Sequence, residues 1–429
     1  MMRLYNELKK RESMGNKIKV ALVGAGQMGT DIVSMASSMP GLDIAVVVDI
    51  NLENAQTAYK LSGLNGNQIR ESSSKTEIED LVMQDKAVIT SDSNIVTEVD
   101  NIDVVIDATG VPEVGAEVGL NSIMNGKDIV MMNVEADVVI GPILNKMAKR
   151  AGVTYTGAAG DEPAAIMEIY DYAKSMGLEV VAAGKGKNNP LQLDANPDTV
   201  RETAEKKGTT PRMLATFVDG TKTMVEMAAV SNATGLVPDV VGMHGPTTNV
   251  EDLPQKFSLK EQGGILNSKG VVDYSLGNVA PGVFVIVTSD NQRVKDSFAY
   301  SKMGSGPNYL LYRPYHLVSL ETPISAARAV IKGEAAIAPE FGLVSETITV
   351  AKKDLKTGET LDGIGGFTVH GSIEKAETAR EKNLLPLGLT HGAVMKTDVK
   401  KGDLLTYDDV EIKKDSIIYQ LRMIQDKML

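Results

Sequence analysis

The sequence predicts an α/β protein in which an N-terminal doubly wound parallel sheet precedes an α+β central domain and a small β-rich C-terminal module. Strand-like and helix-like segments alternate up to about residue 156, which is typical of a parallel sheet with crossover helices. The alternation then stops, and short strands and turn signals prevail after about residue 340. The 429 residues suffice for two or three domains. We place them at 1–156, 157–340 and 341–429, and the helix expected at 321–332 is a candidate to return to the first domain.

A glycine-rich turn follows the first predicted strand, at residues 19–23. Gly24, Gly26 and Gly29 form the pattern G-x-G-x-x-G. The first glycine permits the tight turn, the second lets a pyrophosphate approach the backbone, and the third lets the next helix pack close to the strand. That helix, expected at 27–39, directs its N-terminal amides toward the phosphates. A strand, this motif and a helix in that order predict a Rossmann dinucleotide site rather than another kind of glycine-rich turn.

A carboxylate and a second loop extend the predicted cofactor site. Asp49 ends the strand expected at 44–48, where it can accept hydrogen bonds from a ribose 2′-hydroxyl. The strand at 104–107 ends in Ala-Thr-Gly, and ligands of such sheets lie beyond the carboxyl ends of the strands. An ordinary strand-to-helix turn is the alternative for this second loop. The expected cofactor-binding residues are Gly24, Gly26, Gln27, Met28, Gly29, Asp49, Ala108, Thr109, Gly110 and Asn133.

The composition is that of a soluble globular protein with an excess of acidic residues. Hydrophobic residues make up 43% of the chain, and the formal net charge is −12. This charge disfavours nucleic acid or an anionic membrane as the main partner. The absence of cysteine excludes disulfides, thiolate metal sites and cysteine nucleophiles. The polar N-terminus does not resemble a signal peptide, and no apolar run reaches the length of a membrane span, so we expect a cytoplasmic protein.

Two basic clusters in the central part are candidates for binding an anionic substrate. Lys185 and Lys187 follow a short predicted strand, and with Asn188 they offer ammonium and amide donors to a phosphate or a polyol. Arg313 and His316 form the second cluster, and arginine can bind phosphate through two parallel hydrogen bonds. The alternatives are a solvated basic loop for the first cluster and an ion pair between domains for the second.

Acidic and imidazole side chains of the same part are further candidates. Asp161 and Glu162 lie on a glycine-rich turn before a predicted helix, where they can cap that helix or bind a divalent cation. Lys222 and Glu226 lie four residues apart on a predicted helix and share a face, as in a simple i,i+4 pair. His244 is either a substrate contact or a histidine whose partners lie within its own loop.

Several phrases of the sequence resemble known proteins. Residues 340–415, especially 398–412, resemble a SAF domain, a small β-clip module. The first 340 residues resemble the homoserine-dehydrogenase-like oxidoreductases, and among them the deoxyxylulose-phosphate reductoisomerase-like family. Homoserine dehydrogenases carry Asn-Lys where this chain has Asn-Val, which argues against plain homoserine oxidation. The phrases that carry the resemblance are Asn133-Val-Glu-Ala-Asp137, Gly160-Asp-Glu-Pro163, Gly184-Lys-Gly-Lys-Asn-Asn-Pro190, Asp219-Gly-Thr-Lys222, Gly242-Met-His-Gly-Pro246 and Tyr312-Arg-Pro-Tyr-His316.

The resemblance implies an NADPH- or NADH-dependent reductoisomerase that converts 1-deoxy-D-xylulose 5-phosphate to 2-C-methyl-D-erythritol 4-phosphate. It implies that a metal set of Asp161, Glu162 and Glu226 holds Mg²⁺ or Mn²⁺, and that Lys222 or the metal polarises the carbonyl. The substrate is then a small anionic or polyhydroxy compound. The expected catalytic residues are Lys185, Lys187, Lys222, Asp161, Glu162, Asn188, His244, Arg313 and His316, with Lys185, Lys187 and Arg313 at the anionic end of the substrate.

Two other functions stay open at this point. One is a homoserine-dehydrogenase-like oxidoreductase that acts on another small polyhydroxy carbonyl compound. The other is a non-catalytic sugar-binding or regulatory protein that uses the SAF-like module for interaction. Cofactor choice is open as well, because Asp49 favours NADH whereas reductoisomerases generally use NADPH. We further expect a homo-oligomer, either a dimer or a tetramer.

Overall fold

The structure of the chain, a computed structural model that describes residues 3–428, divides into two compact units. The first unit comprises the chain up to Ala164 together with Leu317–Ala338 and Ser416–Met428. The second comprises Ala165–His316 and Pro339–Asp415. Two late segments of the chain therefore lie with the N-terminal unit, while the three-domain division stays a prediction. No helix in the described part of the chain is long and apolar enough to cross a membrane.

A seven-stranded sheet forms the centre of the first unit. Its strands lie in the order β3-β4-β2-β1-β5-β6-β7, and all neighbouring pairs are parallel. Without the edge strand β3, this is the 3-2-1-4-5-6 order of the dinucleotide-binding fold, and the order reverses between β1 and β5. The predicted fold class is confirmed. The strands are β1 (Ile18–Val23), β2 (Leu42–Val48), β3 (Ile69–Glu71), β4 (Ala87–Thr90), β5 (Val104–Asp107), β6 (Asp128–Met131) and β7 (Tyr155–Gly157).

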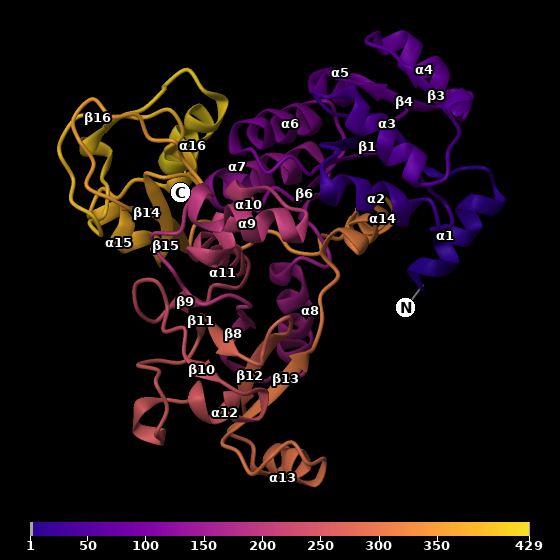
Figure 1. The fold of residues 1–429 in the computed structure, drawn as a ribbon. Coiled ribbons are helices and arrows are strands. Elements are labelled where there is room, and N and C mark those ends of the chain that lie inside the picture. Colours follow the sequence, from indigo (N-terminus) through magenta and orange to yellow (C-terminus); the bar gives the residue numbers. More distant parts are fainter. Residues whose placement is uncertain (1–2, 429) are drawn as a thin grey trace. The chain divides into compact units, whose positions relative to one another are not determined.

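Helices from three separate parts of the chain pack in this unit. Ala326 and Ala327 are fully buried in the same apolar cluster as Ile18 and Leu22 of β1, so a late helix completes the core of the N-terminal sheet. The C-terminal helix α16 packs on α6 and α7, as Figure 1 shows. The helices are α1 (Leu4–Ser13), α2 (Gln27–Ala36), α3 (Leu52–Leu61), α4 (Lys75–Met83), α5 (Ser93–Glu98), α6 (Pro112–Met124), α7 (Val134–Ala151), α14 (Thr322–Lys332) and α16 (Ile417–Met428).

A pair of titratable side chains links α7 to the edge strand β7. The Tyr155 hydroxyl donates to Asp137 Oδ1 at 2.7 Å. Burial raises the pKa of Asp137 to about 6, although the hydrogen bond from Tyr155 acts in the opposite direction. In the unfolded chain the pKa of this carboxyl returns to about 3.9. The folded protein therefore holds a proton on Asp137 over a pH range in which the unfolded chain has lost it.

This pair gives a testable pH dependence of stability. Between about pH 4 and 6 the folded state binds more protons than the unfolded state, so the free energy of unfolding falls as the pH rises. The Asp137→Asn variant lacks this loss, and we expect its stability relative to wild type to increase by about 2–3 kcal/mol from pH 4.5 to pH 7.5. Urea unfolding of both proteins at a series of pH values measures the difference. A difference that does not change with pH would contradict the assignment.

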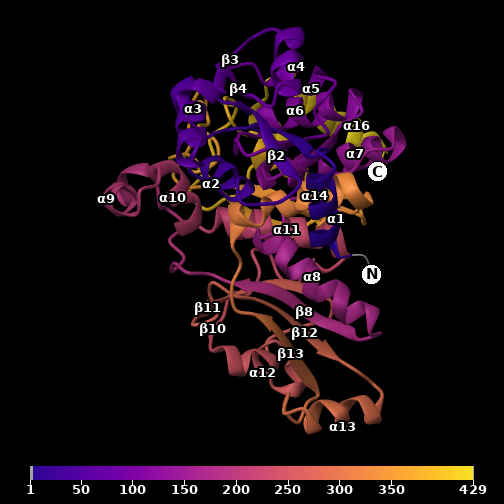
Figure 2. The same cartoon turned by 90° about the vertical axis from the view of Figure 1, so that its right-hand side faces the viewer.

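A six-stranded mixed sheet forms the centre of the second unit, and Figure 2 shows its long strands side by side with α13 at one end. The path is β10-β11-β8-β12-β13, with β9 paired to β11. The pair β8–β11 is parallel, whereas β8–β12 and β12–β13 are antiparallel. The strands are β8 (Glu179–Gly186), β9 (Val237–Pro238), β10 (Thr247–Thr248), β11 (Val271–Gly277), β12 (Val283–Thr288) and β13 (Asn308–Arg313).

The strand β8 is longer than the sequence predicts, and two of its glycines lie within the sheet and not after the strand. We expected the strand to end at Ala183 and a basic loop to follow. Instead, β8 runs to Gly186 and pairs with β11 and β12 on both sides. A Cβ atom at Gly184 would collide with the Asp273 carbonyl, and one at Gly186 with the backbone of Ala280. These glycines allow close approach of backbones within a sheet and do not mark a turn.

Helix α11 (Thr221–Thr234) is the buried centre of the second unit. Every residue of it except Lys222 is buried, so the helix is surrounded by protein rather than lying on a surface. It contacts β11 on one hand and two C-terminal strands, β14 (Ser345–Ala351) and β15 (Val369–Lys375), on the other. The remaining helices are α8 (Glu162–Ser175), α9 (Pro197–Lys207), α10 (Pro211–Val218), α12 (Leu253–Lys256), α13 (Gln292–Tyr300) and α15 (Ala376–Glu381).

The C-terminal part of this unit is rich in short antiparallel pairs. β14 pairs with β15 over seven residues of each strand, and β16 (Val394–Met395) pairs with β17 (Val410–Glu411). The predicted β-rich character is confirmed, whereas the specific resemblance to a SAF domain stays a prediction. Helix α16, which follows these strands in the chain, lies with the first unit.

Candidate cofactor site and candidate active site

The loop after β1 contains three glycines, and the structural reason for having glycine differs from one position to the next. Gly24 has φ +98°, and a Cβ there would lie 2.9 Å from the Ala108 carbonyl oxygen. A Cβ at Gly29 would collide with the Gly24 carbonyl, so the packing of α2 requires this glycine. Gly26 has no atom within 4 Å of its Cβ position and an ordinary φ of −67°. The protein's own packing therefore explains two of the glycines but not Gly26, which is the one whose backbone a pyrophosphate approaches.

The end of β2 places a carboxylate beside this loop. Asp49 Oδ2 accepts a hydrogen bond from the backbone N–H of Ala25 at 2.8 Å, and Oδ1 accepts one from Asn51 N–H at 2.8 Å. These bonds hold the side chain at the glycine loop, where an acid of this fold binds a ribose hydroxyl. The residue after it, Ile50, is 96% exposed, so the surface beside Asp49 is open. Helix α2 begins directly after the loop at Gln27 and has no side-chain cap, which leaves its first amides available to an anion.

A second loop, between β5 and α6, lies against the glycine loop. The buried Asp107 accepts hydrogen bonds from the backbone N–H of Thr109 at 3.0 Å and from its hydroxyl at 2.7 Å. Burial raises the pKa of Asp107, against the effect of these bonds. Asn133 Nδ2 donates to Asp107 Oδ2 at 3.0 Å and to the Val111 carbonyl at 2.8 Å. Ala108, Thr109 and Gly110 thus form a braced loop at the point where the strand order reverses.

The structure places Asn133 differently from what its predicted cofactor contact requires. Its side chain is 1% exposed and its amide is used for the β5–α6 loop. Its Oδ1 also accepts the Ala136 N–H at 3.2 Å and so caps helix α7. The side chain is therefore suited to hold the loop in place rather than to touch a ligand. Sequence reasoning missed its partner Asp107, although this acid ends the second strand that meets the reversal of strand order.

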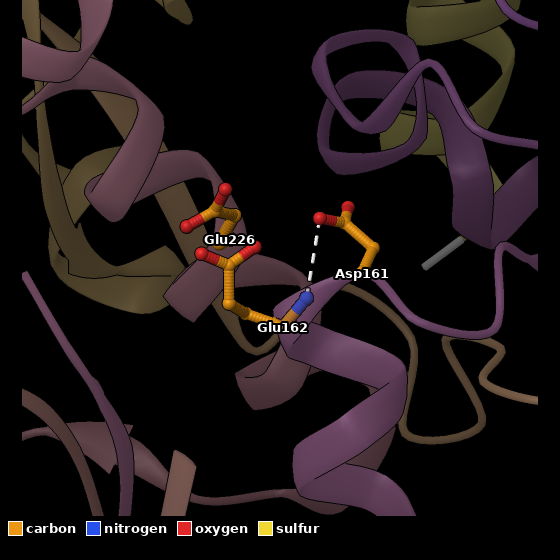
Figure 3. A group of neighbouring side chains, drawn as sticks. All are labelled: Asp161, Glu162 and Glu226. Carbon is orange, nitrogen blue, oxygen red and sulfur yellow. Dashed lines mark hydrogen bonds between the residues drawn. The ribbon is translucent and has the colours of Figure 1, made fainter. Parts of the chain in front are cut away.

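Three carboxylates meet at the beginning of α8. The division of the chain into units falls within this helix, between Ala164 and Ala165. Figure 3 shows Asp161 and Glu162 at the start of this helix and Glu226 from α11. One possible ligand atom from each of the three lies within 4.8 Å of the other two. Asp161 Oδ1 accepts a hydrogen bond from the adjacent Glu162 N–H at 3.1 Å. Asp161 is 6% and Glu226 1% exposed.

A buried lysine stands beside this cluster. Lys185 Nζ, at the end of β8, forms an ion pair and hydrogen bond with Glu226, and its side chain is 7% exposed. Asp161 and Glu226 are buried and Glu162 is partly buried, so the cluster brings oxygen atoms of three carboxylates together within the protein. Oxygen ligands at this spacing suit a hard divalent cation such as Mg²⁺ or Mn²⁺, so the residues present fit the metal that the resemblance implies.

Lys187 does not lie on the solvated basic loop that was the alternative for this cluster. Its side chain is buried, and Nζ donates to the Phe217 carbonyl at 2.5 Å. Burial lowers the pKa of Lys187 to about 8; the nearby Lys185 lowers it further, whereas Asp219 and Glu226 raise it. Lys185 and Lys187 are thus internal groups rather than a solvated pair. Asn188 follows at the exposed bend after the strand.

The low pKa of Lys187 leads to a second testable pH dependence. Because the folded pKa lies below the unfolded value of about 10.4, the unfolded state binds more protons between about pH 8 and 10, and stability rises with pH there. We expect wild type to gain about 1–2 kcal/mol relative to Lys187→Met between pH 7.5 and pH 9.5. Thermal or urea unfolding measures this gain. A parallel pH dependence in the two proteins would show that Lys187 does not titrate in this range.

A buried ion pair connects the C-terminal strands to the turn before α11. Lys352 Nζ lies 2.8 Å from Asp219 Oδ2 and donates to the Ala195 carbonyl at 2.6 Å and the Gly366 carbonyl at 2.8 Å. Asp219 Oδ1 accepts the Thr221 N–H at 2.8 Å, at the start of the helix that carries Lys222. Sequence reasoning missed Lys352, because nothing near it in the sequence signals a partner 133 positions earlier.

The second basic cluster forms an ion pair rather than an open anion site. Arg313 Nη1 lies 3.1 Å from Glu168 Oε2 on α8, and its guanidinium stacks over the ring of Tyr315 at 4.9 Å. Both partners belong to the second unit, so this ion pair is not the pair between domains that was the alternative for Arg313. His316 follows at the end of the same segment and is partly exposed. Neither residue belongs to the carboxylate cluster as defined by its three members.

His244 has partners within its own region. Its Nε2 lies 2.8 Å from Asp239 Oδ2, and its backbone N–H donates to Asp273 Oδ2 at 3.1 Å. Burial raises the pKa of Asp273 to about 6, against the effect of the backbone N–H groups that it accepts from Gly245 and Tyr274. The loop histidine is thus oriented by two acids that sequence reasoning did not single out.

One known protein family matches the part of the chain that contains the carboxylate cluster. Residues 160–322 match the family described as "Oxidoreductase DRL, catalytic domain". The match covers less than half of the chain, and it includes the carboxylate cluster, Lys185 and Lys187. It supports an oxidoreductase as the general class. None of the curated proteins matches the chain.

Solved structures give weaker likenesses. A probable dehydrogenase from Thermotoga maritima is 13% identical, with a TM-score of 0.44, and the match covers 75% of this chain and 92% of that one. A myo-inositol dehydrogenase from Corynebacterium glutamicum ATCC 13032 is 9% identical, with a TM-score of 0.42, and covers 74% and 89% of the two chains. At this level of similarity they carry no argument about substrate or mechanism.

Proposed function

We propose that the protein is an NAD(P)H-dependent oxidoreductase that acts on the carbonyl or hydroxyl carbon of a small polyhydroxy or anionic compound. The observation that carries this proposal is the glycine loop at the reversal of strand order, where Gly26 alone has no packing reason to be glycine. The match of residues 160–322 to an oxidoreductase catalytic domain supports the same class. The acid at the end of β2 supports a nicotinamide dinucleotide rather than a mononucleotide, because it suits a ribose hydroxyl.

The residues of each part have distinct tasks in this proposal. The bound dinucleotide supplies or accepts a hydride. The amides at the start of α2 hold its pyrophosphate, and Asp49 accepts hydrogen bonds from a ribose. Asp161, Glu162 and Glu226 hold Mg²⁺ or Mn²⁺, which when bound supplies Lewis-acid polarisation of a substrate oxygen. Lys185 fixes the orientation of Glu226 through its ion pair, and Lys222 is the partly exposed cation of α11.

We further propose that the reaction is that of a reductoisomerase, with 1-deoxy-D-xylulose 5-phosphate as the candidate substrate. Two things support this: the phrases that resemble this family, and the approach of its three implied metal ligands to within 4.8 Å. The anionic end of the substrate then requires cations other than the paired Arg313 and the buried Lys187, since both are already in use. The residues that bind the anionic end of the substrate therefore differ from those expected from the sequence.

A simple dehydrogenase or reductase without isomerisation is the second candidate function. Asp49 favours it, because this carboxylate repels a 2′-phosphate and selects NADH, whereas reductoisomerases generally use NADPH. The two candidates differ in product. Reduction alone leaves the carbon skeleton unchanged, whereas a reductoisomerase returns a branched product.

Turnover of a reduced cofactor tests both candidates. Purified protein is mixed with NADH or NADPH, with Mg²⁺ or Mn²⁺, and with a panel of sugar phosphates and polyhydroxy carbonyl compounds, and the absorbance of the reduced nicotinamide is followed. NMR of the product distinguishes a rearranged skeleton from a reduced one. Sugar binding without oxidation of either cofactor under any of these conditions would favour the non-catalytic alternative. The expected homo-oligomer is a separate proposal, which light scattering tests.

A further inference from the structure

Helix α7 of the first unit contains a proline in its interior. Pro142 has no backbone N–H, and its ring crowds the carbonyl of the residue four positions before it. Such a position disturbs the hydrogen bonds of the adjacent turn, and helices use inserted side chains or water to satisfy the affected groups. The next step of the ladder joins the Val139 carbonyl and the Ile143 N–H, which are four residues apart.

A side chain of the C-terminal helix binds both of these backbone groups. Gln425 Oε1 accepts the Ile143 N–H at 3.0 Å, and Gln425 Nε2 donates to the Val139 carbonyl at 2.9 Å. Gln425 is fully buried. One amide side chain of α16 thus matches the donor and the acceptor next to the proline of α7. A buried amide with both ends used in this way fixes the position of one helix on another.

The other end of the C-terminal helix is held by α6. The carboxylate of Glu113 accepts the Ile417 N–H at 2.7 Å and the Ile418 N–H at 3.2 Å, so it caps the first turn of α16. A carboxylate at a helix N-terminus is stabilised by the unpaired amides and by the helix dipole. Glu113 is itself in the first turn of α6, two residues after Val111. Helix α16 is therefore attached at both of its ends to helices of the Rossmann unit.

Both attachment points lead to the same cofactor loop. α6 begins directly after the loop of Ala108–Val111, and α7 is capped by Asn133, whose side chain donates to the Val111 carbonyl. α16 joins these two helices and thus braces the loop that they hold. We infer that the C-terminal helix is a positioning element of the nicotinamide half of the dinucleotide site, acting through Glu113 and Gln425. This inference rests on the proposed function, because it takes the β5–α6 loop as part of a dinucleotide site.

The inference predicts a selective loss of affinity. NADH reaches from the glycine loop across to the β5–α6 loop, whereas ADP carries only the part that the glycine loop and Asp49 bind. In the full chain, Gln425→Ala and Glu113→Gln are each expected to weaken NADH binding by at least about fivefold, the size of a lost cap, while ADP affinity stays within about twofold. Gln420→Ala is the matched control, since Gln420 is an exposed glutamine of the same helix. Titration measures the affinities, and thermal unfolding is recorded for each variant.

The possible outcomes distinguish a failure of the role inferred for α16 from a failure of the proposed function. Loss of NADH affinity with ADP affinity retained supports the positioning role. Equal loss of both affinities together with a lower melting temperature would mean that α16 serves only the stability of the unit, and would overturn the inference. Unchanged NADH affinity in both variants would overturn it as well. If wild-type protein binds neither NADH nor ADP, the proposed function itself fails and the inference fails with it.

Discussion

The Glu226→Gln variant is expected to lose turnover by at least about a hundredfold, the effect typical of removing a group that stabilises developing charge. Glutamine keeps the shape of the side chain and removes its charge. The change deprives a hard cation of one of three carboxylates and leaves the buried Lys185 without the counter-charge that it has in the structure. Breaking a buried ion pair on one side costs about 3–5 kcal/mol of stability, so a fall in melting temperature accompanies the loss of activity.

A second change separates the loss of stability from the loss of chemistry. In the double variant Lys185→Met with Glu226→Gln, both charges of the buried ion pair are removed together, and most of the lost stability is expected to return. Activity is expected to stay low, because the metal set is still incomplete. Glu168→Gln is the matched control: this glutamate of α8 forms the more exposed ion pair with Arg313, where the contribution is about 0–1 kcal/mol.

Metal binding gives a readout that does not depend on turnover. A divalent cation that binds only the folded state raises the melting temperature as its concentration rises. We expect this rise with Mn²⁺ or Mg²⁺ in wild type and in Glu168→Gln, and no rise in Glu226→Gln. A cation response that survives Glu226→Gln would show that the three carboxylates are not the metal site. Full activity of that variant would remove Glu226 from the mechanism.

The Rossmann unit was predictable because its signals are local. The glycine loop, the strand before it and the acid at Asp49 lie within a few dozen residues, and each has a direct backbone reason. The strand order then follows from the rules of parallel sheets. The carboxylate pair Asp161 and Glu162 was visible for the same reason, since both lie on one turn. Their approach to Glu226 came from the family resemblance, and no spacing in the sequence indicates it.

The errors concern residues whose meaning depends on distant partners. The predicted strand was too short, because the backbones of β11 and of the segment before β12 approach Gly184 and Gly186 and the strand continues to Gly186. Lys185 then pairs with Glu226, 41 residues away along the chain. Arg313 likewise finds Glu168, 145 residues earlier. A basic cluster in a sequence shows where positive charges lie along the chain. Whether these side chains are free to bind an anion depends on which acids the fold places beside them.

The sequence pattern made the helix at 321–332 a candidate to return to the first unit, as the structure shows, but it gave no sign that Ser416–Met428 returns as well. The small apolar side chains of Ala326 and Ala327 fit under the sheet, and a helix of that composition fits many surfaces equally well. The attachment of α16 depends on Glu113 and Gln425. Glutamate and glutamine usually lie on protein surfaces, so neither residue indicates such a contact in the sequence. Pro142 within α7 is the one local sign that a partner is needed there, since its position leaves backbone groups to be satisfied.

The Gly26→Val variant is expected to fold normally and to lose NADH binding by at least about a hundredfold. A Cβ at this position meets no atom of the protein within 4 Å, and φ is −67°, so valine causes neither a clash nor backbone strain. The side chain instead fills the space through which a pyrophosphate reaches the amides of α2.

Gly66→Val is the matched control, because Gly66 is an exposed glycine of the same unit with open space around its Cβ position. The emission of NADH itself reports binding, since the chain has no tryptophan to interfere. If Gly26→Val binds NADH as wild type does, the glycine loop is not the dinucleotide site. If both valine variants lose binding together with their cooperative unfolding transition, the open space at these positions is not what the structure indicates.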